Sequence, residues 1–285
     1  MLDSRRLFVE ALGEHDLNVL SMLDDYPGSP DQLRADLRAN PDAIETYLAD
    51  SRVFDLLFES SASDQIRVLT PALAFGVLVH KTIRDLSSAS HVPEWVGAGE
   101  RLPVFDVGSL LEFIEDITRR FMVIELLASF TRVASGTMWV QTTRGYRRRR
   151  FSELDPASLA EVVGSLPGDR QAAGYRRLGD VSLFLTGVFP DHTARHPMGV
   201  IGRARLARAT GIGADWSGGA EYLRFLERAG RHWYERAIDM SVPTVGGGRP
   251  LQDFAANFTQ ARRFLNYLGD RYLHRFDTGL MNPIG

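Results

Sequence analysis

Five arginines within seven residues, Arg144 and Arg147 to Arg150, are the first group of side chains suited to binding chemistry. They belong to the segment TMWVQTTRGYRRRRF, residues 137–151. Its β-branched and aromatic residues, with a turn at Arg-Gly-Tyr, predict a β-hairpin at about residues 137–151. Because successive side chains of a strand alternate between its faces, both faces carry arginines. Neither face can be buried without leaving charged guanidinium groups unpaired.

The arginines of this hairpin have a structural and a functional interpretation. Charge along an exposed strand prevents unwanted pairing with other chains. Guanidinium groups beside a tyrosine also suit phosphates and stacked bases. We expect contact with an anionic partner, either a nucleic acid or an acidic protein surface, and pairing with the aspartate-rich N-terminal helices is the intramolecular alternative. The predicted contact residues are Arg144, Tyr146, Arg147, Arg148, Arg149 and Arg150.

Histidines and acids suggest a second site. His192 and His196 are four residues apart, so one helical turn would place both imidazoles on the same side, with Asp191 as an oxygen ligand. His232 and Glu235 form H-x-x-E on a strongly patterned segment. The four residues His192, His196, His232 and Glu235 predict a metal or small-molecule site. The alternative is that these histidines are surface hydrogen-bonding groups.

A glycine triplet at residues 246–248 precedes Arg249 and a predicted helix start. Exposed backbone N–H groups at such a start can cradle an anion, with Arg249 as its counter-charge. A flexible linker explains the same residues. The aromatic residues, among them four tryptophans and 16 phenylalanines, suit a ligand pocket, but a chain of this length buries many such rings in an ordinary core.

Composition excludes several classes of chemistry. The chain has 285 residues, 44% hydrophobic and 24% charged, which is typical of globular proteins. It has no cysteine, so disulfides, thiolate metal sites and cysteine nucleophiles are excluded. Lys81 is the only lysine, which excludes a P-loop and leaves one candidate for a Schiff base. With a net charge of −3, contact with nucleic acid would have to be local.

No membrane segment is expected. The N-terminal residues lack the apolar stretch of a signal peptide. The most apolar segment, residues 68–83, is too short for a bilayer and predicts a buried helix. We therefore expect a cytoplasmic protein that does not contact a membrane.

Helix signals dominate the elements that would position these residues. Ser29, Thr70 and Asp155 each precede a proline, which favours an N-cap with proline in the first turn. Ser109 and Glu112 form a capping box, and the apolar pattern after them predicts one helix to Gly136. Residues 90–106 predict a loop with short strands at 94–96 and 102–104. Further helices are predicted at 169–189, 198–209, 218–239 and 251–275.

The predicted fold is mainly α, a compact multi-helix domain with one β-hairpin at about residues 137–151. A single domain over residues 1–285 is expected, with a division near residue 150 as the alternative. The predicted function is that of a non-catalytic regulatory or interaction protein that contacts an anionic partner through the hairpin. The alternative is a helical enzyme or sensor that binds a small molecule or metal near His192, His196, His232 and Glu235.

Overall fold

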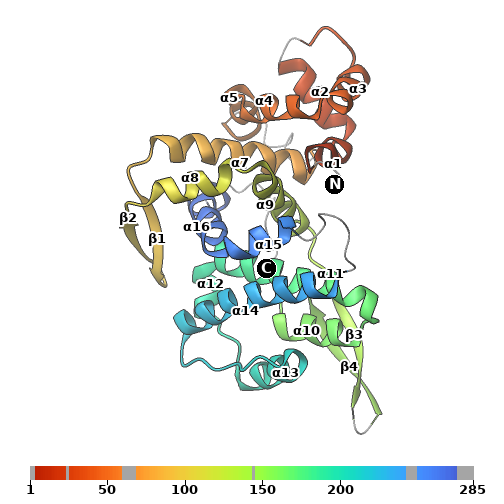
Figure 1. Ribbon diagram of the computed structural model, residues 1–285, viewed down its shortest axis with the longest axis vertical. Coiled ribbons are helices and arrows are strands. Elements are labelled where there is room, and N and C mark those ends of the chain that lie inside the picture. Colours follow the sequence, from red (N-terminus) through yellow and green to blue (C-terminus); the bar gives the residue numbers. More distant parts are fainter. Residues whose placement is uncertain (1–3, 24–25, 60–68, 143–144, 242–248, 275–285) are drawn as a thin grey trace. The chain divides into compact units, whose positions relative to one another are not determined.

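The computed structural model describes residues 4–23, 26–59, 69–142, 145–241 and 249–274. These residues are mainly helical, with two two-stranded hairpins, so the predicted fold class is confirmed (Figure 1). The chain forms two compact units. Unit 1 comprises 1–92, 103–131 and 267–285, and unit 2 comprises 93–102 and 132–266. In the described part of the chain, no helix is both long and apolar enough to cross a bilayer.

Unit 1 is helical. Its central element is the helix α7, Pro71–Ser88, in which most residues of the first three turns are buried, as the apolar segment predicted. Thr70 caps this helix through its side chain, which accepts from the N–H of Leu73. The other elements are α1 Ser4–Ala11, α2 Glu14–Leu23, α3 Pro30–Ala39, η1 Pro41–Ala43, α4 Ile44–Ala49, α5 Ser51–Phe54, η2 Asp55–Glu59, α8 Val107–Glu115, α9 Ile117–Ser129 and η3 Gly269–Leu273.

The buried carboxylate of Asp16 ties the N-terminal helices to α7. Asp16 is 0% exposed, and it accepts from the N–H of Gly13 at 2.8 Å. It also accepts from the N–H of Thr70 at 2.9 Å and from the hydroxyl of Thr70 at 2.6 Å. A buried carboxylate is tolerated only when its oxygens are paired in this way. Asp16 therefore fixes the start of α7 against α2.

The predicted helix from Ser109 to Gly136 is wrong. Helix α8 begins two residues earlier, at Val107, and the hydroxyl of Ser109 donates to the carboxylate of Asp106 at 2.7 Å. The chain then leaves helical geometry at Asp116, which has φ −66° and ψ 120°. The Asp116 carboxylate accepts from the N–H of Arg119 and starts α9. A local side-chain cap therefore divides the predicted helix in two.

Unit 2 combines helices with the two hairpins. The strands are β1 Val92–Gly97, β2 Glu100–Val104, β3 Ser135–Thr142 and β4 Gly145–Ser152. The β1 and β2 strands confirm the short strands predicted within residues 90–106. The helices are α10 Pro156–Ser165, α11 Gly168–Gly187, α12 Pro190–Arg195, α13 Val200–Thr210, α14 Gly219–Met240, α15 Arg249–Ala256 and α16 Phe258–Leu268. The single helix predicted over 251–275 is therefore interrupted, and η3 follows its second part.

The core of unit 2 depends on close packing of α11 against its neighbours. A Cβ at Gly179 would lie 2.5 Å from the ring of Tyr234 in α14, and one at Gly187 would lie 2.8 Å from Leu265 in α16. The Tyr234 ring is fully buried, and its hydroxyl donates to Asp180 at 2.8 Å. The glycines of this helix thus permit close approach of other side chains, as helix-interior glycines often do.

Candidate functional site

The arginine-rich segment forms the predicted hairpin. Strands β3 and β4 pair antiparallel, with Trp139 opposite Arg148 and Thr137 opposite Arg150. Gln141 lies opposite Tyr146. Directly opposite residues share one face of a two-stranded sheet. One face, here called the Trp139 face, therefore includes Thr137, Trp139, Arg148 and Arg150.

The described side chains of the Trp139 face are open to solvent. Trp139 is 67% exposed, which is unusual for an indole. Arg148 and Arg150 are also exposed. Arg148 approaches the hydroxyl of Thr137 at 3.5 Å, and neither arginine forms an ion pair with a carboxylate of the described residues. Arg144 and the side chains of Tyr146, Arg147 and Arg149 lie outside the described residues.

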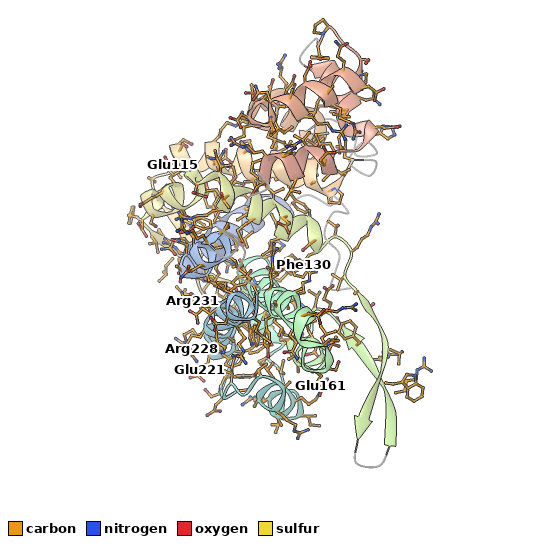
Figure 2. All side chains as sticks on the ribbon, turned by 45° about the vertical axis from the view of Figure 1, so that its right-hand side comes forward. Glu115, Phe130, Glu161, Glu221, Arg228 and Arg231 are labelled. Atoms are coloured by element: carbon orange, nitrogen blue, oxygen red, sulfur yellow. The ribbon has the colours of Figure 1, made fainter. Side chains whose placement is uncertain are left out.

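The base of the hairpin is held to the helices of unit 2. Glu153, directly after β4, accepts from Arg177 of α11 at 2.5 Å. Its backbone N–H donates to the carbonyl of Ala134 at 2.9 Å, and its carboxylate accepts from the N–H of Ala134 at 3.0 Å. Beyond this base the two strands extend away from the helices of unit 2 as a separate arm (Figure 2). The hairpin therefore has an anchored end and a free surface.

Two further candidates from the sequence are Arg249 and Lys81. Arg249 is the first residue of α15 and is exposed, whereas the glycines at 246–248 lie outside the described residues. Lys81, the one candidate for a Schiff base, donates to Asp85 at 2.6 Å.

His192 of α12 and His196, the residue directly after that helix, lie close together. Their ring centroids are 4.5 Å apart, and Nδ1 of His196 lies 3.0 Å from the carbonyl oxygen of His192. Partial burial, together with the neighbouring His196 and Arg195 side chains, lowers the pKa of His192.

Asp191, the expected oxygen ligand, has a structural role instead. Its carboxylate accepts from the Trp95 indole N–H at 2.8 Å, from the Gly99 N–H at 2.8 Å and from Arg101 at 3.0 Å. Burial raises the pKa of Asp191, but these hydrogen bonds outweigh burial and lower the pKa overall. Asp191 thus holds the β1–β2 hairpin, whose turn includes Gly99 at φ +79°.

The predicted four-residue metal site is not assembled. Nδ1 of His232 is 4.0 Å from the Glu235 carboxylate, and the two side chains are 55% and 66% exposed. Within the described residues, no group of three or more histidine or carboxylate side chains could hold a metal ion. His192 with His196, and His232 with Glu235, are therefore two separate pairs.

The sequence did not indicate a polar pocket in unit 2, here called the Trp95 pocket. Its volume is about 300 Å³. Trp95 of β1, Thr186 of α11 and Pro190 of α12 line it together with Leu223 and Arg224 of α14. Glu227 of α14 and Arg262 of α16 complete its charged side. The elements concerned are far apart in sequence, so no local pattern pointed to this pocket.

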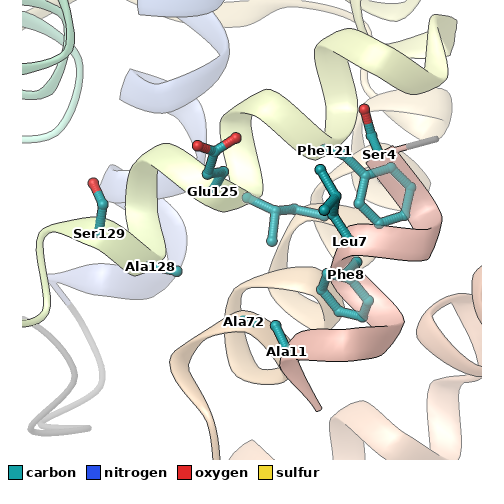
Figure 3. Close-up of a pocket in the computed structure, with 10 residues that line it drawn as sticks. Ser4, Leu7, Phe8, Ala11, Ala72, Phe121, Glu125, Ala128 and Ser129 are labelled. Carbon is teal, nitrogen blue, oxygen red and sulfur yellow. The ribbon is translucent and has the colours of Figure 1, made fainter. Parts of the chain in front are cut away.

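Unit 1 has a larger and more apolar pocket of about 470 Å³ (Figure 3). Leu7 and Phe8 of α1 face Phe121 and Glu125 of α9 across it. Of the described residues that line this pocket, Glu125 alone is charged. The pocket has volume for an apolar group but few polar groups to orient one.

In comparisons with known proteins, no protein-family model, no curated protein and no solved structure matches this chain.

Proposed function

We propose that the protein is a non-catalytic interaction protein that binds single-stranded nucleic acid through the Trp139 face of the β3–β4 hairpin. One observation carries the proposal: the exposed indole of Trp139 lies directly opposite the exposed Arg148, on an arm that extends from the unit. An exposed indole loses hydrophobic stabilisation that burial would give. A stacked base would restore it.

The charges of the Trp139 face fit the same class of partner. Arg148 and Arg150 have no carboxylate partner in the described residues, so their guanidinium groups are available for phosphates. Stacking on an aromatic ring contributes about 1–3 kcal/mol per base and needs an unpaired base. An acidic protein surface would pair with the arginines but would leave the indole without a partner. Nucleic acid therefore satisfies both kinds of side chain.

Titration of a fluorescent single-stranded oligonucleotide, followed by anisotropy at several salt concentrations, tests the proposal. Each phosphate neutralised contributes about 0.7 to the slope of log affinity against log salt for a single strand. The variant Arg148→Gln/Arg150→Gln should therefore reduce that slope by roughly 1.4. Trp139→Ala should weaken binding by roughly 5- to 150-fold, the loss of one stacked base.

A matched control separates the hairpin from general electrostatics. Arg228 and Arg236 of α14 are exposed, so Arg228→Gln/Arg236→Gln makes the same change in net charge at another place. This control should bind like the unaltered protein. Equal losses in both double variants, or no binding at low salt, would contradict the proposal. If polyglutamate displaced the oligonucleotide as effectively as unlabelled nucleic acid does, the partner would be an acidic protein surface and not nucleic acid.

A further inference from the structure

We propose that the Trp95 pocket of unit 2 is a binding site for a small aromatic carboxylate. This site is independent of the hairpin and of its proposed function. The alternative predicted from the sequence placed a small molecule near His192. The pocket lies beside that residue, since Pro190 lines it and Asp191 holds its aromatic wall.

The wall of the pocket is a fixed aromatic ring. The Trp95 indole donates to Asp191 at 2.8 Å, and Asp191 is itself held by Arg101 and by the N–H of Gly99. The ring is therefore oriented before any ligand arrives. Leu223, only 6% exposed, provides apolar surface in the same pocket. A flat apolar group fits between such surfaces, because aromatic pairs favour offset or edge-to-face stacking.

The acidic groups at the pocket are already paired. Glu227 accepts from Arg231 at 2.8 Å and from Thr259 at 2.6 Å, and Nε of Arg262 lies 3.1 Å from its other oxygen. Glu94 accepts from Arg262 at 2.6 Å and from Arg263 at 2.8 Å. These carboxylates hold the guanidinium group of Arg262 in place. Because each of the two carboxylates is paired with two arginines, the pocket favours an anion over a cation.

Arg224 supplies the charge that a ligand would meet. It lines the pocket and is exposed. Glu221, one turn earlier on α14, accepts instead from the backbone N–H and hydroxyl of Ser217, at 2.6 and 2.7 Å. Arg224 has no ion pair or hydrogen bond within the described residues and interacts with Glu221 only at longer range. A free guanidinium group binds a carboxylate through two parallel hydrogen bonds.

The size of the pocket limits the ligand. Its volume of about 300 Å³ equals that of roughly ten water molecules at about 30 Å³ each. A ligand of roughly ten non-hydrogen atoms therefore fits. Phenylacetate has this size and both required groups, and it serves as the probe.

The test follows the tryptophan indole N–H signals of the ¹⁵N-labelled protein. The chain has four tryptophans, and Trp95→Phe identifies the signal of Trp95 by its loss. Phenylacetate should shift that signal saturably, in the millimolar range or tighter. Phenylacetamide, which lacks the charge, and acetate, which lacks the ring, should each bind at least tenfold more weakly.

Variants of α14 assign the charge. Arg224→Gln should weaken phenylacetate binding at least tenfold, whereas Arg228→Gln, an exposed residue one turn further along (Figure 2), should leave it unchanged. The absence of a saturable shift at Trp95 would overturn the proposal. So would equal affinity for phenylacetamide, or equal losses in the two arginine variants. Each outcome leaves oligonucleotide binding by the hairpin unaffected.

Discussion

Replacement of Gly179 by alanine should destabilise unit 2, although alanine favours helices. A Cβ at this position would lie 2.5 Å from two carbons and 2.9 Å from a third carbon of the Tyr234 ring. Carbon atoms pack best at about 3.5–4.0 Å, so the overlap is about 1 Å. The ring cannot move aside freely, because it is fully buried and its hydroxyl is bonded to Asp180.

The size of the effect follows from two opposing terms. Overpacking of a core costs about 1–3 kcal/mol, and an overlap of this size with a fixed ring belongs at the upper end. Replacing a helix-interior glycine by alanine contributes about 1 kcal/mol in the other direction. The net loss for Gly179→Ala is therefore about 2 kcal/mol, or roughly 4–8 °C in melting temperature for a unit of this size.

Urea denaturation followed by tryptophan fluorescence measures this loss. All four tryptophans, Trp95, Trp139, Trp216 and Trp233, belong to unit 2, so their emission reports the unfolding of that unit. Gly164→Ala in α10 is the matched control, since a Cβ there meets no atom within 4 Å. It should raise stability by up to about 1 kcal/mol. The reasoning is refuted if Gly179→Ala is as stable as the unaltered protein.

Two further predictions concern unit 1, measured by urea denaturation with far-ultraviolet circular dichroism. Asp16→Ala should lower the free energy of unfolding by about 3 kcal/mol, because it leaves the half-buried donors of Gly13 and Thr70 unsatisfied. Glu14→Ala on the exposed side of α2 should cost less than about 1 kcal/mol. Similar losses in the two variants would show that Asp16 is not an anchor. Burial, followed by the charges of Arg120 and Arg84, lowers the pKa of His80 to about 3. Between pH 6.5 and 3, His80 therefore becomes protonated only in the unfolded chain. Stability should fall as the pH drops through that window, by about 2 kcal/mol from pH 6.5 to 5. His80→Leu should lose this part of the pH dependence, and identical pH dependence in both proteins would contradict the assignment.

The sequence predicts best what is decided within a few residues. The caps at Ser29, Thr70 and Asp155 form as expected, because each side chain reaches a backbone N–H two or three residues ahead. The hairpin at 137–151 is likewise encoded by its own residues, but its predicted turn at Arg-Gly-Tyr is wrong, because Gly145 and Tyr146 belong to β4 and pair with Thr142 and Gln141. These elements need no tertiary partner to explain their positions.

Competing local signals explain the wrong helix prediction. Ser109 and Glu112 match a capping box. However, the hydroxyl of Ser109 donates to the carboxylate of Asp106, three residues earlier. Asp116 lies inside the predicted helix, whereas in the structure it caps a new one. The Asp106 side chain makes no capping hydrogen bond of its own, so a pattern of capping residues does not locate the start of α8.

The sites are less predictable than the elements, because they join distant residues. Asp191 and Trp95 are 96 positions apart, and Glu94 and Arg263 are 169 apart. Periodicity gave no reason to pair them. The exposed indole of Trp139 was also missed as a binding group, since most tryptophans are largely buried and the strand register was unknown.

The division of the chain into two units has a consequence for biosynthesis. Unit 1 includes residues 267–273, which come after the whole of unit 2 in the order of synthesis. More than half of the polypeptide is therefore synthesised after the N-terminal helices and before the last residues that pack in unit 1. Tyr272, whose hydroxyl donates to Asp85, is one of these residues that are synthesised last. Domains usually fold in order from the N-terminus as they are translated, so in this protein the unit that starts first is also the last to be completed.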